Sequence, residues 1–189
     1  MDKPFFIISK ATQVTTSNLF DSVLKRAREI LQRDINKVTT VRKEPNEIHL
    51  QVDEQLTANP EEYQIDLHDH QVIIKSGSNL GVMYGALAVS RSILKIDDFW
   101  YWMDTPIQKQ AYISWSNFNL HLPNYKTKYR GWSINDELLI NTWKDHDSNQ
   151  YVWEQAFEAA LRVGCNMIIP GTGLTSQRNP QLASNYGLI

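Results

Sequence analysis

The length, composition and charge of this chain describe an ordinary globular protein and exclude several kinds of partner. Its 189 residues are 42% hydrophobic and 21% charged, so one domain or two small ones can bury a core. The net charge of -2 provides no overall positive field, and we expect no nucleic acid partner.

The amino terminus and the single cysteine bear on the cellular compartment. "MDKPFFIISK" holds five apolar or aromatic residues broken by Pro4, which is too few for a secretory signal. No stretch approaches the ~20 apolar residues of a membrane span. Cys165 has no second cysteine to pair with and lies in an apolar run, so it is expected in the core. A cytoplasmic protein without a membrane partner is therefore expected.

The first half of the chain shows alternating helix and strand patterns. Apolar residues at spacings of three and four predict a helix over 18–32, with a cap at Thr16, Ser17 or Asn18. "KVTTV" and "NEIHLQV" read as strands, and "YQIDLHDHQVIIKSG" reads as a hairpin. A helix capped by Ser78 or Asn79 follows, in which Gly81 and Gly85 allow a neighbouring backbone to come close. These elements predict a small α/β sandwich.

An aromatic segment, "DFWYWMDTP", comes next. Its four rings, Phe99 to Trp102, either pack between two layers or form a platform on which a sugar stacks. From Ile107 to about Lys126 the sequence is polar and irregular. This stretch is expected to connect to a second unit.

The second unit has the pattern of a parallel strand, helix and strand. "KYRGWSI" predicts a strand, "NQYVWEQAFEAALRVG" a helix that ends at Gly164, and "NMIIP" a strand covered on both faces. Two parallel strands cannot cover their own faces. Either they join the first sheet or the chain is a truncated part of a larger fold.

Polar residues follow both of these strands. Asn135, Asp136 and Glu137 come after the first, and Gly171, Thr172 and Gly173 come after the second. In parallel α/β folds, ligands bind at the carboxyl ends of strands. The same residues would also suit the cap and first turn of a helix. The sequence alone leaves both interpretations open.

Other candidate sites have weaker support. His68 and His70 flank Asp69 at the hairpin tip, where a metal would still need a further ligand. His146 is expected in a solvated loop. Phosphate-loop and serine-nucleophile signatures are absent from the sequence. We therefore expect no metal and no cofactor.

Several of these segments resemble glycoside hydrolase family 115, the xylan alpha-glucuronidases. The similarity covers most of residues 63–189. The positions that carry it are Gly77, Gly81, Tyr84, Gly85, Trp100, Tyr101, Trp102, Asp104, Pro106, Lys109, Tyr129, Arg130, Gly131, Ile134, Asn135, Asp136, Glu137, Trp143, Gly164, Asn166, Pro170, Asn179, Leu182, Ala183 and Gly187. Where the family commonly has tryptophans around the end of its second barrel strand, this chain has Ile169 and Gly173.

The resemblance implies a fold and a domain order. Residues 1–106 would form an N-terminal α/β domain of glycosidase type, and 107–127 a linker. Residues 128–189 would form the first βαβ unit of a TIM-type (β/α)8 barrel, truncated before its third strand. An incomplete barrel exposes the edge of "NMIIP", so a homo-oligomer is a further expectation.

The resemblance also implies an activity. The parent protein would be a glycosidase acting on glucuronic acid or related side chains of plant polysaccharides such as xylan, by inverting hydrolysis with paired carboxylates. Asp136 and Glu137 would be catalytic and Asn135 would bind the sugar, with the principal acid and base beyond Ile189, so the 189-residue chain alone is expected to be inactive. The alternatives are a non-catalytic carbohydrate-binding or structural module and a small protein of unrelated role.

Overall fold

The chain divides into two compact units, Met1–Pro123 and Asn124–Ile189. The structure is a computed structural model that describes residues 5–56, 59–121, 123, 125–135, 137–171, 173 and 177–189, with only the backbone of Glu137. No helix in these ranges is long and apolar enough to cross a membrane.

The first unit is built on a four-stranded sheet in the order β2-β3-β5-β4. Its strands are β2 (Gln13–Thr16), β3 (Glu47–Val52), β4 (Tyr63–His68) and β5 (Gln71–Ser76). The first two pairs in this order are parallel, and β4 runs antiparallel to β5 as the expected hairpin. The hairpin prediction is therefore confirmed.

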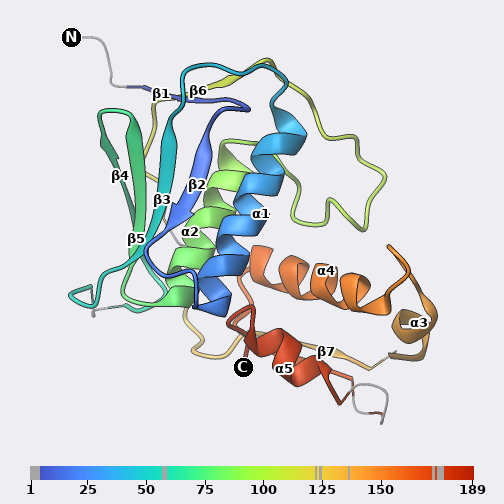
Figure 1. Ribbon diagram of the computed structural model, residues 1–189. Coiled ribbons are helices and arrows are strands. Elements are labelled where there is room, and N and C mark those ends of the chain that lie inside the picture. Colours follow the sequence, from blue (N-terminus) through green and yellow to red (C-terminus); the bar gives the residue numbers. More distant parts are fainter. Residues whose placement is uncertain are drawn as a thin grey trace. The chain divides into compact units, whose positions relative to one another are not determined.

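Two helices, α1 (Ser22–Val38) and α2 (Asn79–Ser92), cover one face of this sheet (Figure 1). The strands alternate between buried and partly exposed positions, and Ile48, Leu50, Val72 and Ile74 are fully buried. This alternation, with apolar side chains on one face and polar side chains on the other, is typical of a sheet with one covered face. The predicted α/β layers are confirmed.

Gly85 illustrates why α2 lies so near the sheet. A Cβ atom at Gly85 would come within 2.5 Å of Ile74 Cγ2, so only glycine fits this approach. The cap of α2 is Ser78, whose side chain accepts a hydrogen bond from the Gly81 amide. The expected cap at Ser78 is confirmed, and Gly85 is closely packed as expected, although against the side chains of Ile74 and Tyr63 and not against a backbone.

The expected start of α1 is wrong. The helix begins at Ser22 because Asp21 caps it, accepting a hydrogen bond from the Leu24 amide at 2.9 Å. Phe20, predicted within the helix, is fully exposed. The expected strand "KVTTV" is also absent, since α1 continues to Val38 and Thr39 makes only an isolated bridge to Gln110.

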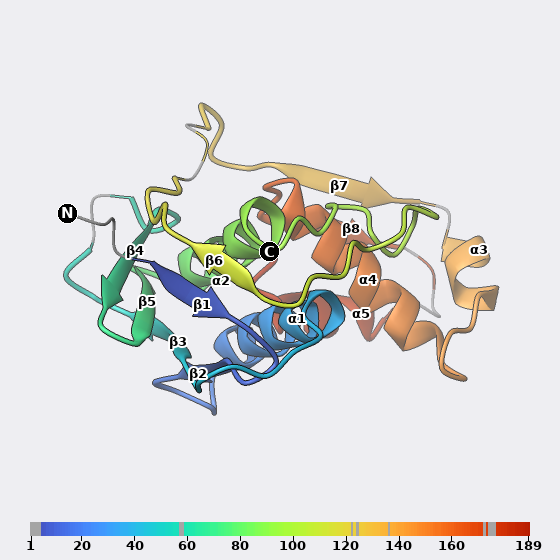
Figure 2. The ribbon, with the colours of Figure 1, turned by 90° about the horizontal axis from the view of Figure 1, so that it is seen from above.

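A second, two-stranded sheet pairs β1 (Phe6–Ile8) with β6 (Ile113–Trp115) in antiparallel register. Figure 2 shows the two strands side by side. Phe6 and Trp115 are directly opposite and pack edge to face, with ring centroids 6.3 Å apart. The segment expected to be an irregular linker therefore contains a strand of the first unit.

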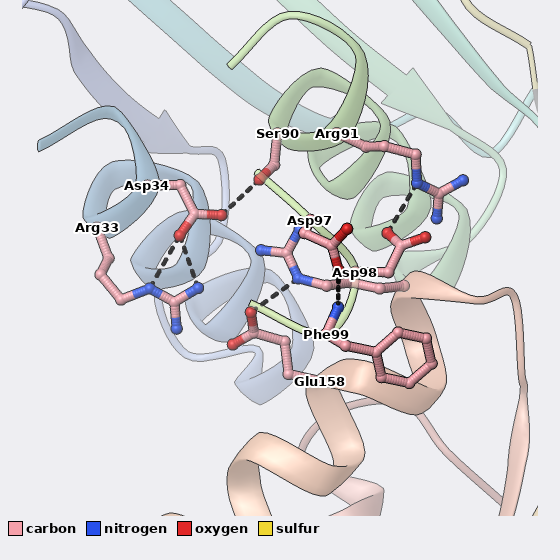
Figure 3. A network of polar contacts seen from close by, with 9 residues as sticks. Arg33, Asp34, Ser90, Arg91, Asp97, Asp98, Phe99 and Glu158 are labelled. Carbon is pink, nitrogen blue, oxygen red and sulfur yellow. Dashed lines mark hydrogen bonds and ion pairs between the residues drawn. The ribbon is translucent and has the colours of Figure 1, made fainter. Parts of the chain in front are cut away.

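A buried carboxylate joins the two helices of the first unit. Asp34 on α1 is fully buried and accepts hydrogen bonds from Arg33 and from Ser90 on α2, as seen in Figure 3. A buried charge needs such donors, because burial without them is costly. Figure 3 also shows Arg91 paired with Asp98, at 2.8 Å.

The second unit contains β7 (Gly131–Ile134), α3 (Glu137–Thr142), α4 (Asn149–Arg162), β8 (Met167–Pro170) and α5 (Asn179–Ser184). The strands β7 and β8 are parallel and form a sheet of their own. Gly164 follows α4 with φ +88°, as expected for a residue that ends a helix. The predicted strand, helix and strand are confirmed, and they do not join the four-stranded sheet.

The core of this unit is aromatic. Trp153 and Phe157 on α4 are fully buried, and Phe157 packs against Tyr186 with centroids 6.0 Å apart. The prediction that "NMIIP" is covered on both faces is wrong, because Ile169 is 47% exposed while Ile168 is 5% exposed. Cys165 is buried as expected.

Candidate functional site

The ends of β7 and β8 form the edge at which the sequence places candidate site residues. Ile134 and Pro170 are register partners and are the last residues of their strands. Asn135 and Gly171 therefore leave the sheet at the same edge, the edge where ligands bind in parallel α/β folds. Gly171 has φ +84°, so the chain turns sharply there.

The structure describes the three predicted site residues to different extents. Asn135 follows β7 directly and is exposed, so its amide is open to solvent. Asp136 lies outside the described residues. Glu137 is the first residue of α3, and its side chain is outside the description. The catalytic roles of Asp136 and Glu137, and the competing role of Asp136 as a helix cap, therefore stay predictions.

Asn179 supports this edge from the next helix. It is the first residue of α5 and is 1% exposed, and its Nδ2 donates to the Pro170 carbonyl at 3.1 Å. The hydrogen bond ties the last residue of β8 to α5. Sequence reasoning identified Asn179 only through the family resemblance and missed this contact.

The opposite end of the strand pair is held by Arg130 and Asn166. The Asn166 side chain accepts from the Arg130 amide at 2.9 Å and donates to the Lys128 carbonyl at 2.7 Å. Arg130 Nε donates to the Gly164 carbonyl at 2.7 Å, and its guanidinium lies 4.2 Å from the Tyr125 ring centroid. These contacts hold the beginnings of β7 and β8 side by side.

Cys165 is an ionisable side chain near these strands whose pKa is shifted. Burial raises the pKa of the Cys165 thiol, against the opposing charge of Arg130, so this cysteine stays protonated and is a poor nucleophile. Within the described ranges no group of three or more histidine, cysteine or acidic residues is placed to hold a metal. The His146 side chain is 73% exposed, as predicted.

The open face of the first unit's sheet carries a polar cluster that sequence reasoning missed. Thr15 donates to the Glu47 carboxylate and lies 2.7 Å from His49 Nδ1, and Gln71 donates to Glu47 at 2.9 Å. The Thr15 hydroxyl lowers the pKa of Glu47, burial opposes this change, and Gln71 adds to it. Only strand register brings these residues together, since they come from three separate strands.

The aromatic segment is neither a buried core cluster nor a bare platform. Trp100, Tyr101 and Trp102 are half-buried and contact each other edge to face. The Lys37 ammonium lies 3.6 Å from the Trp100 ring centroid. This contact covers one face of the Trp100 ring.

Comparisons with known proteins point to one group of enzymes. The family model described as glycosyl hydrolase family 115 matches residues 123–189. A search of curated proteins found no match.

Solved glycosidases share the fold at low sequence identity. A family GH115 4-O-methyl-alpha-glucuronidase with specificity for decorated arabinogalactans is 18% identical over 97% of this chain and 29% of its own, with a TM-score of 0.75. A GH138 enzyme targeting pectin rhamnogalacturonan II is 12% identical over 94% of this chain and 30% of its own, with a TM-score of 0.55. A GH20 exo-β-N-acetylglucosaminidase from Vibrio harveyi is 14% identical over 88% of this chain and 23% of its own, with a TM-score of 0.52.

The chain thus spans less than a third of the length of these enzymes. The family model covers the second unit, and the likeness in fold extends over both units. The expected resemblance to family 115 glycoside hydrolases is confirmed.

Proposed function

We propose that this chain is the N-terminal portion of a glycoside hydrolase that removes glucuronic acid or related uronic acid side chains from a plant polysaccharide such as xylan. The observation that carries the proposal is the family 115 match, which falls on the unit whose two parallel strands end at Ile134 and Pro170, directly before Asn135 and Gly171. The carbohydrate partner follows from the same match.

In this proposal the second unit is the first βαβ unit of a (β/α)8 barrel. Parallel strands separated by a helix support it. The large exposed apolar side chains of Leu138, Leu139 and Ile169 support it as well, because further barrel elements would bury such surface. The first unit, Met1–Pro123, is the accessory α/β domain. Self-association through the exposed strand edge belongs to the same proposal.

The chemistry assigned to the site is inverting hydrolysis. Such enzymes use two carboxyl groups about 6.5–9.5 Å apart, with a water between one of them and the sugar. Asp136 and Glu137 are the carboxyl groups that this chain contributes to the catalytic site beside that pair, and Asn135, exposed at the strand end, hydrogen-bonds a sugar hydroxyl. The principal acid and base are assigned to later strands, so the chain alone binds uronic acid without hydrolysing it.

Two measurements test this function. The 189-residue chain is titrated with glucuronic acid and with xylo-oligosaccharides carrying it, using calorimetry, and the same ligands are assayed for released uronic acid. We expect weak binding, no turnover, and loss of binding in Asp136→Ala and Asn135→Ala. Asp104→Ala, at an exposed position in the first unit, is the matched control and should bind as the parent does.

The outcomes separate the alternatives. Turnover by the chain would contradict its assignment as an inactive portion. Binding that survives both substitutions, or no binding at all, would favour a non-catalytic accessory module. The closed core of the first unit, with Ile48, Leu50, Val72 and Ile74 fully buried, is what favours that second candidate.

A further inference from the structure

A pocket of about 420 Å³ is lined by residues of the first unit. Its walls come from β1, from the loop before β3, from the tip of the β4–β5 hairpin and from the residue before β6. In Figure 1 this tip and the β1–β6 pair are at the same end of the sheet. The volume is within the usual range of small-molecule sites, roughly 300–1,000 Å³.

Asn46 contributes an unusual group to the lining. The residue is 9% exposed, and its Nδ2 donates to the Ile7 carbonyl at 2.9 Å. Its Oδ1 is buried and has no hydrogen-bond partner in the described part of the chain. Since buried acceptors are nearly always paired, a hydroxyl or amide donor from a ligand would complete this group. The bond from Nδ2 fixes the amide so that Oδ1 is the atom left for that donor.

Aromatic side chains form the outer walls. Phe5 is 59% exposed and Tyr112 is 42% exposed, and both line the pocket. The Lys43 ammonium lies 4.7 Å from the Tyr112 ring centroid, which holds that ring in place. Exposed aromatic rings beside hydrogen-bonding groups suit a ligand with one apolar and one polar side.

The charges at the pocket indicate a neutral ligand. Lys43 is accompanied by Glu44, Asp69 and His70, so no excess of positive charge is available for a uronate or phosphate. A second, more open hollow of about 630 Å³ continues from Asn46, Asp69 and His70 toward Thr15, Glu47 and Gln71. Hydroxyl, carboxylate and amide groups therefore extend away from the aromatic end.

We propose that this pocket binds a neutral sugar unit of a polysaccharide chain, with the sugar's C–H face on Tyr112 and a hydroxyl donating to Asn46 Oδ1. The adjoining polar hollow takes the next sugar unit. The residues that line this site belong to the first unit and are not the candidate active-site residues, so it would hold the polysaccharide backbone by contacts of its own. The choice of polysaccharide rests on the proposed function, whereas the pocket itself does not.

The test uses the full chain and neutral tetrasaccharides without uronic acid: xylotetraose, cellotetraose and β-1,4-galactotetraose. Binding is followed by nuclear magnetic resonance, with the Asn46 side-chain amide as the local reporter. At least one tetrasaccharide should shift that amide at millimolar concentration. Tyr112→Ala should weaken binding by about tenfold, as expected when an aromatic contact surface is lost.

Control variants test whether the sugar binds in this pocket. Phe20→Ala removes an aromatic ring that is fully exposed and outside the pocket, and it should leave binding unchanged. Asn46→Ala should also weaken binding, provided that its thermal unfolding shows a folded chain. Binding that is lost in Asp136→Ala but kept in Tyr112→Ala would overturn the proposal, as would the absence of an Asn46 shift with all three sugars. If only the uronic acid titration fails, the proposed function fails and this site stands.

Discussion

The four-stranded sheet of the first unit and the two-stranded sheet of the second differ in how their apolar side chains are covered. In the first unit, Ile48, Leu50, Val72 and Ile74 are all fully buried, and α1 and α2 cover one face of their sheet (Figure 1). In the second unit, Ile168 is buried but its neighbour Ile169 is 47% exposed, and Leu138 on α3 is 76% exposed. A sheet with one apolar face is complete with one helical layer, whereas an apolar strand with two apolar faces needs two.

This difference in coverage means that the two units differ in how well water can solvate their outer surfaces. The first has a polar outer face, organised by hydrogen bonds such as that from Gln71 to Glu47, and water can solvate the rest of it. The second presents apolar side chains that water solvates poorly. We therefore expect the first unit to have the higher free energy of unfolding of the two.

The largest effect is expected from Trp153→Ala in the second unit. The ring is fully buried against Phe157 and donates to Asn141 Oδ1 at 3.0 Å, and truncating such a residue costs about 3–5 kcal/mol. Trp143→Ala, at a position 49% exposed, should cost less than about 1 kcal/mol. Hydrogen exchange would locate the loss. Faster exchange in β7 and β8, with β3 and β5 unchanged, would show that the second unit loses stability by itself. Equal acceleration in both units would contradict this expectation.

A smaller effect is expected from Gly164→Ala. The residue has φ +88°, and a Cβ atom would lie 1.9 Å from the Tyr125 hydroxyl oxygen, so backbone strain and a steric clash both oppose the change. We expect a loss of about 1–3 kcal/mol in unfolding free energy. In the Tyr125→Ala background the clash is absent, so the same substitution should cost only the backbone part. An identical cost in both backgrounds would contradict the clash.

Two matched serine caps compare the units directly. Ser78 caps α2 by accepting from the Gly81 amide, and Ser148 caps α4 by accepting from the Gln150 amide. Each serine-to-alanine change should cost about 0.5–2 kcal/mol in denaturant unfolding. Ser78 also donates to the Pro60 carbonyl, so Ser78→Ala should be the costlier of the two. A larger loss of unfolding free energy for Ser148→Ala would contradict the expectation that the additional hydrogen bond of Ser78 makes its cap the more stabilising.

The smallest effect concerns pH and is confined to the first unit. The pKa of Glu47 lies below its ordinary value of 4.5, chiefly because Thr15 donates to the carboxylate. A lowered pKa in the folded chain means that the stabilisation is present above that ordinary value and is lost as pH falls through the folded one. The Glu47 side chain is 39% exposed, so solvent screening keeps the contribution below about 1 kcal/mol.

The Thr15→Val variant measures the contribution of the ionised Glu47 carboxylate to stability. It should lower stability at neutral pH and converge with the parent chain in acid, as followed by urea unfolding over a pH series. Thr16→Val, one residue along β2 on the opposite face, is the control. A difference between Thr15→Val and the parent that grows toward acid would contradict the assignment.

Residues close together in the sequence predicted much of the local structure. The apolar spacing of α4, the glycine after it and the hairpin of β4 and β5 are as expected, because periodicity and turn chemistry act within a few residues. The approach of α2 through Gly85 was also predicted. In the candidate site, the placement of Asn135 and Gly171 at one edge followed from the same local patterns.

The tertiary structure decided what depends on distant partners. The pairing of Phe6 with Trp115, the start of α1 at the Asp21 cap and the separation of β7 and β8 from the first sheet were not readable from local pattern. Nor were the Thr15 and Glu47 cluster or the unpaired Asn46 oxygen. Local periodicity sets which face of an element is apolar, but only packing of the whole chain selects the partner that covers it.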